Sequence, residues 1–184
     1  MQNNALQTLL SASHGVLEQL HRLAMSLSTS QYTQPLDLLG GNTIGKHYRH
    51  IIEFYQCLIK NAEVVNYDKR LRNTDIENSP VIANAIIEEI LLHLDAEKVS
   101  DKQLHYHADF SETGTEDISV ATSFGRELAY NIEHAVHHMA ILQMVVKHYF
   151  KEIELEEGFG VAASTLRYQQ QNHVHSNVSA PGPR

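Results

Sequence analysis

The sequence contains a single cysteine and no long apolar run. Cys57 cannot form an intrachain disulfide, and one thiol cannot hold a thiolate metal cluster. No apolar run approaches the roughly 18–20 residues that are needed to span a bilayer. Residues 1–5 also lack the basic and apolar regions of a secretion signal. We therefore expect a cytoplasmic protein.

Positive charge is scarce as well. The chain has 14 Lys and Arg residues against 22 Asp and Glu residues, which gives a formal net charge of −8. Its basic residues are scattered, apart from the short cluster Lys69–Arg72. Because nucleic-acid-binding proteins normally present a basic face, we expect no nucleic acid partner. We expect no membrane partner either.

Apolar side chains recur at helical spacing in four segments, which predicts four amphipathic helices. The first covers residues 5–28, and the second follows the N-cap residue Thr43 and runs to about Val65. The third covers about 80–96 and the fourth about 122–150. Because no convincing set of strands accompanies them, we predict an all-α fold, a four-helix bundle with long connections after the first and third helices.

The other segments are predicted to be irregular. Residues 104–110 alternate weakly and are the best candidate for a short extended segment or hairpin arm. Gly158 and Gly160 end regular structure after the fourth helix. Residues 169–184 are rich in Gln, His, Asn, Ser and Pro, which predicts a disordered C-terminal tail. The predicted domain therefore covers residues 1–168.

The candidate functional residues are histidines. His134 and His138 stand four residues apart on one edge of the apolar stripe of the fourth helix, so both rings can reach one metal ion. His50 lies at the corresponding edge of the second helix and is the favoured third ligand. His47, one turn earlier, is an alternative ligand or a group that supports the site. His137 points away from the stripe and is expected at the surface.

Two polar residues share the edge of the fourth helix with these histidines. Glu127 and Asn131 are candidates for orienting the imidazoles or for contacting a substrate. Glu127 has a simpler explanation, because a carboxylate near a helix N-terminus interacts favourably with the helix dipole. A lone histidine at a helix edge is also more often hydrogen-bonded than metal-bound, so a metal-free helical protein is a further interpretation.

Two segments resemble motifs of the DinB-like superfamily. Residues Thr43–Glu53 (TIGKHYRHIIE) are similar to its second-helix motif, in which a Ser or Thr is followed seven residues later by a histidine. Residues Arg126–His138 resemble its fourth-helix His-x-x-x-His motif, and residues 159–166 resemble the C-terminal segment of one branch. The resemblance extends over nearly the whole chain to about residue 168.

This resemblance implies a four-helix bundle of up-down-down-up type that holds a divalent metal. The ligands it implies are His50, His134 and His138, while His47 falls where the family usually has an apolar residue. Three neutral imidazoles leave a position open, as catalytic metal sites do, and they suit Zn, Ni or Fe. Similar family members include transferases that use low-molecular-weight thiols such as bacillithiol or mycothiol, and others have no assigned activity.

The resulting hypothesis is a metal-dependent enzyme that acts on a small molecule through a metal-bound thiol or water, as a transferase or hydrolase. Its catalytic residues are not identified by the sequence. The alternative is a non-catalytic metal-binding module that serves a stress response or an interaction. A homodimer would suit either hypothesis, because the faces of helical bundles often pair.

Overall fold

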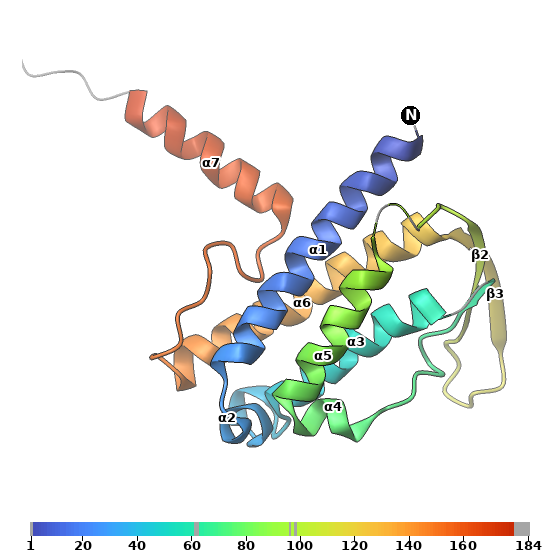
Figure 1. Ribbon diagram of the computed structural model, residues 1–184, viewed down its shortest axis with the longest axis horizontal. Helices are drawn as coiled ribbons and strands as arrows, with labels where there is room; N and C mark the ends of the chain where they lie inside the picture. Colours follow the sequence, from blue (N-terminus) through green and yellow to red (C-terminus); the bar gives the residue numbers. More distant parts are fainter. Residues whose placement is uncertain (1, 61–62, 96, 98, 179–184) are drawn as a thin grey trace, which may run out of the picture.

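The computed structural model describes residues 2–60, 63–95, 97 and 99–178 (Figure 1). Helices occupy most of this length, and a small sheet lies at one end (Figure 1). The elements in chain order are α1 (Gln2–Ser26), α2 (Thr29–Thr33), the 3-10 helix η1 (Asp37–Leu39), α3 (Ile44–Lys60), β1 (Val64–Val65), α4 (Thr74–Asn78), α5 (Pro80–His93), β2 (Gln103–Asp109), β3 (Asp117–Ser123), α6 (Phe124–Tyr149) and α7 (Ala163–Val178).

The helical core consists of α1, α3, α5 and α6, which correspond to the four predicted helices. Helix α1 packs against α5 and α6, and α3 packs against the same two helices from the other side. Side-chain hydroxyls cap three of these helices, and Thr43 is the N-cap expected from the sequence. Thr43, Ser79 and Ser123 accept hydrogen bonds from the backbone N–H groups three residues further on.

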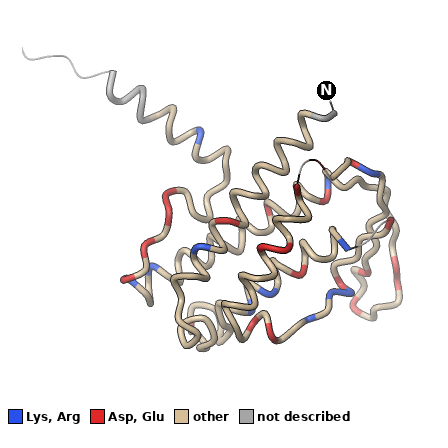
Figure 2. Tube along the Cα trace, in the orientation of Figure 1, with Lys and Arg blue, Asp and Glu red and all other residues tan. Residues whose placement is uncertain are grey.

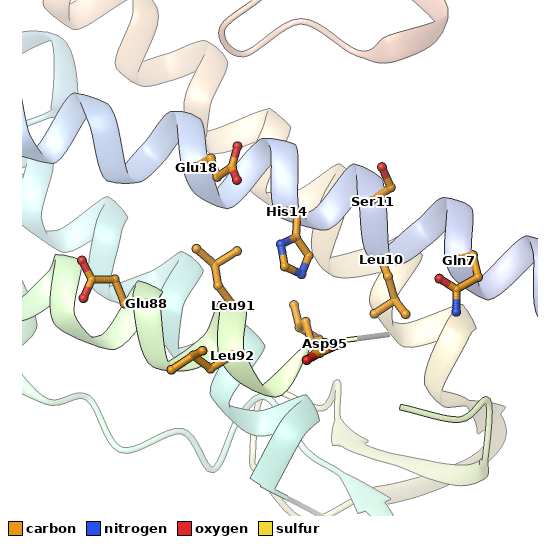
Figure 3. A pocket seen from close by; sticks show the side chains of 10 residues that line it. Gln7, Leu10, Ser11, His14, Glu18, Glu88, Leu91, Leu92 and Asp95 are labelled. Atoms are coloured by element: carbon orange, nitrogen blue, oxygen red, sulfur yellow. The ribbon is translucent and has the colours of Figure 1, made fainter. Parts of the chain in front are cut away.

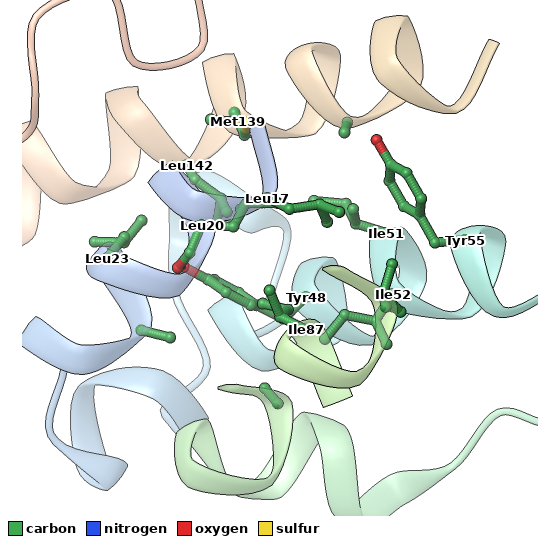
Figure 4. Packing of buried hydrophobic residues seen from close by; sticks show 14 of the residues in the cluster. Leu17, Leu20, Leu23, Tyr48, Ile51, Ile52, Tyr55, Ile87, Met139 and Leu142 are labelled. Atoms are coloured by element: carbon green, nitrogen blue, oxygen red, sulfur yellow. The ribbon is translucent and has the colours of Figure 1, made fainter. Parts of the chain in front are cut away.

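The centre of the core lies between α1 and α3 (Figure 4). Leu17 and Leu20 of α1 and Ile51 of α3 are at most 1% exposed. Tyr48 and Tyr55 are also fully buried, and both hydroxyls are paired. Tyr48 donates to the carbonyl oxygen of Leu20 at 2.8 Å, and Tyr55 accepts from Ser13 at 3.2 Å. Pairing removes the cost of burying these polar groups.

A three-stranded mixed sheet adjoins this helical core. Its order is β1-β2-β3, in which β1 pairs parallel to β2 and β3 pairs antiparallel to β2. The prediction of an all-α, up-down-down-up four-helix bundle is therefore wrong: the described residues form an α/β structure. The second helix also ends earlier than predicted, at Lys60, because Val64 and Val65 pair with β2 instead.

The physical reason for this error lies in the strands themselves. On β2, the alternating residues Leu104 and Ala108 are each 2% exposed, and Tyr106 between them is half-buried. This is the weak alternation of residues 104–110 seen in the sequence. Its partner β3 is exposed over residues 117–121, so its place in the sheet depends on backbone pairing rather than on an apolar pattern.

Helix α7 extends away from the helical core (Figure 1). Within residues 163–172, Leu166 is half-buried and the other side chains are exposed. The segment predicted as a tail, residues 169–184, begins inside this helix, and its residues 179–184 lie outside the described part of the chain. The domain boundary at residue 168 stays a prediction.

Charged side chains are not concentrated on any one helix or strand. Lys and Arg are spread along the trace, with Asp and Glu between them (Figure 2). The absence of a nucleic acid partner stays a prediction. Among the described residues, no helix has both the length and the apolar character needed to cross a bilayer.

Candidate metal centre

Helices α3 and α6 bring three histidines together. His50 comes from α3, and His134 and His138 come from successive turns of α6. Each side chain is half-buried, and one ring nitrogen of each lies within 4.8 Å of the others. The three residues are those that the sequence predicts as ligands. Their arrangement is compatible with a metal site.

The rings face one another closely. The Nε2 atoms of His50 and His134 are 2.8 Å apart, and the ring centroids of His134 and His138 are 4.7 Å apart. Three nitrogens that bind one zinc ion at tetrahedral angles would be about 3.3 Å apart. The observed separations, from 2.8 Å to at most 4.8 Å, lie on both sides of that spacing. Small side-chain rotations would therefore bring the three nitrogens to ligand positions, so the donor set fits a divalent ion.

The surroundings keep the imidazoles neutral, which is the form that binds a metal. Burial lowers the pKa of His138 to about 3, and the neighbouring His50, His134 and other histidines contribute. The pKa of His50 is lowered to about 4, first by burial and then by His134 and the positive charge of Arg70. Burial also lowers the pKa of His134, with a smaller effect from His137.

A fourth histidine reaches the centre from the preceding turn of α3. His47 is not one of the three grouped nitrogen donors, but its Nδ1 lies 2.9 Å from the Nδ1 of His138. At this distance the two nitrogens share a hydrogen bond, with one donating and the other accepting. Burial lowers the pKa of His47, so a neutral acceptor is available there. His137 is exposed, as expected from its position on the helix.

Aromatic rings enclose His134. The ring of Phe54 stacks on His134 at 4.5 Å between centroids, and the ring of Tyr130 stacks on it at 5.7 Å. Tyr67 in turn stacks on Phe54 at 4.5 Å. These residues are not among the candidates that the sequence pattern indicates. Phe54 and Tyr130 could have been found, because each stands four residues from a predicted ligand and therefore on the same helix face.

Glu127 and Asn131 belong to a buried polar cluster beside these rings. Glu127 is 6% exposed and accepts hydrogen bonds from the hydroxyls of Tyr67 at 2.8 Å and Thr122 at 2.7 Å. Asn131 donates to the Tyr67 hydroxyl at 3.2 Å. Burial and the adjacent Glu127 raise the pKa of Tyr67, which therefore keeps its proton. Among the described residues, these hydrogen bonds join Glu127 and Asn131 to Tyr67 and Thr122 rather than to an imidazole.

A second buried carboxylate, Glu53, lies on α3 three residues after His50. Glu53 is 1% exposed, accepts a hydrogen bond from the backbone N–H of Asn73 at 2.6 Å and lies 3.7 Å from the guanidinium of Arg70. Arg70 also lies over the ring of Phe54, 5.9 Å from its centroid. Arg70, which lies beside Glu53, contributes after burial and His134 to the lowered pKa of His50.

Two hollows are relevant to the position of a substrate. A cavity of about 250 Å³ adjoins the centre, with Tyr130 and Glu127 among its lining residues. A larger groove of about 740 Å³ lies between α1 and α5, lined by residues such as His14, Leu91 and Leu92 (Figure 3). The three clustered histidines do not line this groove. They do not line the smaller cavity either, but Tyr130 of its wall stacks on His134, so the smaller cavity is the one in contact with the histidine cluster.

One curated relative shares part of this sequence. It is named FK506-binding protein 5, from Rhizopus delemar, and is 34% identical over 150 residues. The match covers 80% of this chain but only 38% of that relative. No family model matches the chain. No solved structure matches it either.

Proposed function

We propose that this protein is a metal-dependent enzyme in which His50, His134 and His138 hold one divalent ion. The observation that carries the proposal is that these three imidazoles converge from two helices, with one nitrogen of each within 4.8 Å of the others. Three protein ligands leave a coordination position open, which is typical of catalytic zinc sites. An ion bound there would lower the pKa of a bound water or thiol, so either a hydrolase or a thiol-dependent transferase fits.

The surrounding residues have defined tasks under this proposal. Phe54 and Tyr130 stack on His134 and limit its ring rotation. His47 holds His138 through the Nδ1 contact. Burial, with smaller contributions from His134 and Arg70, lowers the pKa of His50 and keeps it unprotonated. No residue is assigned as the acid or base of the reaction. The metal can be Zn, Ni or Fe, because all three accept imidazole ligands.

Membership of the DinB-like superfamily is part of the proposal. It is supported by the order and spacing of the three histidines, which meet as the resemblance implies. The mixed sheet is not among the features that the resemblance implies. FK506 binding is not proposed for this chain, because the relative with that name is matched over 38% of its length and its name does not say which part binds FK506.

The test is metal analysis of protein purified without a histidine tag and without chelators. We expect one divalent ion per chain by elemental analysis, lost in His134→Ala and His138→Ala. The exposed neighbour His137→Ala is the matched control and should keep the ion. Protein that contains no metal and takes up neither zinc nor nickel would refute the site.

A second assay separates an enzyme from a binding module. Metal-loaded protein is mixed with low-molecular-weight thiols and electrophiles, and with hydrolysable esters and amides, and product formation is followed. Turnover by the unaltered protein that is lost in the His138→Ala variant supports an enzymatic function. Full metal binding with no turnover in either set, together with lower thermal stability of the ligand variants, supports the non-catalytic metal-binding module instead.

A further inference from the structure

The cavity next to the metal centre has mostly aromatic walls. It is lined by Tyr67, Tyr106, Phe110, Arg126, Glu127 and Tyr130. Its volume of about 250 Å³ is just below the range of drug-sized ligand pockets, so it suits a small molecule. Tyr130 connects the cavity to the metal centre, because the same ring stacks on His134.

Three of the aromatic rings pack against one another and form a continuous wall of the cavity. The ring centroid of Tyr67 is 6.0 Å from that of Tyr106 and 5.6 Å from that of Tyr130, with interplanar angles of 42° and 40°. Tyr67 is fixed by its hydrogen bonds to Glu127 and Asn131. Phe110 is 76% exposed, which is unusual for such a large apolar side chain and leaves its ring free to cover a bound molecule. Aromatic ligands gain from offset or edge-to-face contacts with such walls.

The cavity lining contains one cationic side chain, Arg126, and one carboxylate, Glu127. Arg126 is exposed, and its guanidinium carbon lies 6.0 Å from the ring centroid of Tyr130. Within the described residues it forms no ion pair with a carboxylate. The other charged group, Glu127, is buried, and both its oxygens already accept hydrogen bonds from Tyr67 and Thr122. A ligand would therefore meet the guanidinium as the available ionic partner.

We propose that this cavity binds a small aromatic anion, a flat ring that carries a carboxylate or sulfonate group, as the substrate of the metal centre. The ring packs against the wall that Tyr67, Tyr106 and Tyr130 form, and the anionic group pairs with Arg126. This inference rests on the proposed function, because it assigns the substrate class of that same site.

The first experiment measures binding to metal-free protein by calorimetry, with 2-naphthoate as the probe. We expect saturable binding that is about fivefold weaker for the neutral 2-naphthamide and for the Arg126→Gln variant, since each loses one solvent-exposed ion pair. Arg167→Gln, which removes an exposed arginine on α7, is the control and should bind as the unaltered protein does. Equal affinity of the unaltered protein and Arg126→Gln would place the probe elsewhere, such as the groove between α1 and α5, and would overturn the proposal.

The second experiment measures whether the probe lies beside the metal. The protein is loaded with Co²⁺, and the proton resonances of 2-naphthoate are compared with those in the Zn²⁺-loaded protein. Paramagnetic broadening that is lost in Arg126→Gln supports the proposal, and broadening that persists in that variant shows direct binding to the ion and overturns the role of Arg126. If no metal binds, the proposed function fails, while the first experiment still decides which ligand class the cavity takes.

Discussion

The contact between His47 and His138 leads to a quantitative prediction about metal affinity. If His138 binds the ion through Nε2, its Nδ1–H donates to the Nδ1 of His47, which lies 2.9 Å away. Metal-bound histidines commonly donate their second ring N–H in this way, and the acceptor fixes both the tautomer and the ring orientation. His47→Phe keeps a ring of similar size but removes the acceptor. We therefore expect weaker binding without loss of the site.

The expected size follows from the contact itself. One hydrogen bond between neutral groups contributes about 1 kcal/mol, which is about fivefold in the dissociation constant. Loss of the fixed tautomer adds to this, and replacing such outer partners typically weakens metal binding by roughly 10- to 100-fold. The bond here joins two neutral rings rather than a ring and a carboxylate, so we expect the lower end, about tenfold.

The assay is competition with a chromophoric chelator for zinc at pH 7.5. The matched control is His137→Phe, because the ring of His137 also packs against His138, at 5.5 Å between centroids, but from an exposed position. A change of less than about twofold in His47→Phe would refute the orienting role. Loss of binding as complete as in His138→Ala would show that His47 is a ligand.

Two further predictions concern stability. The folded-state pKa of about 4 for His50 and about 3 for His138 lies below the ordinary value of about 6.5. Below pH 6.5 the unfolded chain therefore binds more protons at these histidines than the folded chain does. The melting temperature of the metal-free protein should then fall as the pH drops from about 6.5 towards 4. A melting temperature that does not change over this window would contradict the burial of neutral rings. Gly45→Ala should lower the free energy of unfolding by about 1–3 kcal/mol in a denaturant titration, because its Cβ would overlap the carbonyl oxygen of Glu77. Gly15→Ala, with nothing near its Cβ, should instead be neutral or stabilising by up to about 1 kcal/mol, and equal losses in both variants would contradict the packing argument.

The core helices and the histidine cluster were predictable because their signals are local. Helical spacing predicts four helices in nearly the observed positions, and Thr43 is the N-cap that the sequence indicates. The four-residue spacing of His134 and His138 placed both rings on one face. The choice between His47 and His50 was harder, because both lie near the margin of the same apolar stripe. In the structure, His50 joins the group of three and His47 contacts His138.

The sheet and the cavity were not predictable because they depend on contacts between distant segments. Val64 and Val65 look like the end of a helix until His105 and Tyr106 are known to pair with them. Tyr67 lies in a polar segment, and its importance arises only from Phe54, Glu127 and Asn131, none of which is a sequence neighbour.

The junction between β3 and α6 has a mechanical consequence. Ser123 is both the last residue of the strand and the N-cap of the helix, so no linker separates them. The next two backbone N–H groups, of Phe124 and Gly125, donate to the Lys102 carbonyl and the Asp101 carboxylate at 2.9 and 2.8 Å. The first turn of α6, a part of a helix that usually frays, is therefore held in place by these hydrogen bonds. The β2–β3 hairpin and the first turn of α6 therefore form one continuous unit, so any tilt of the hairpin would also displace Glu127, one turn along the helix and hydrogen-bonded to Thr122 of β3.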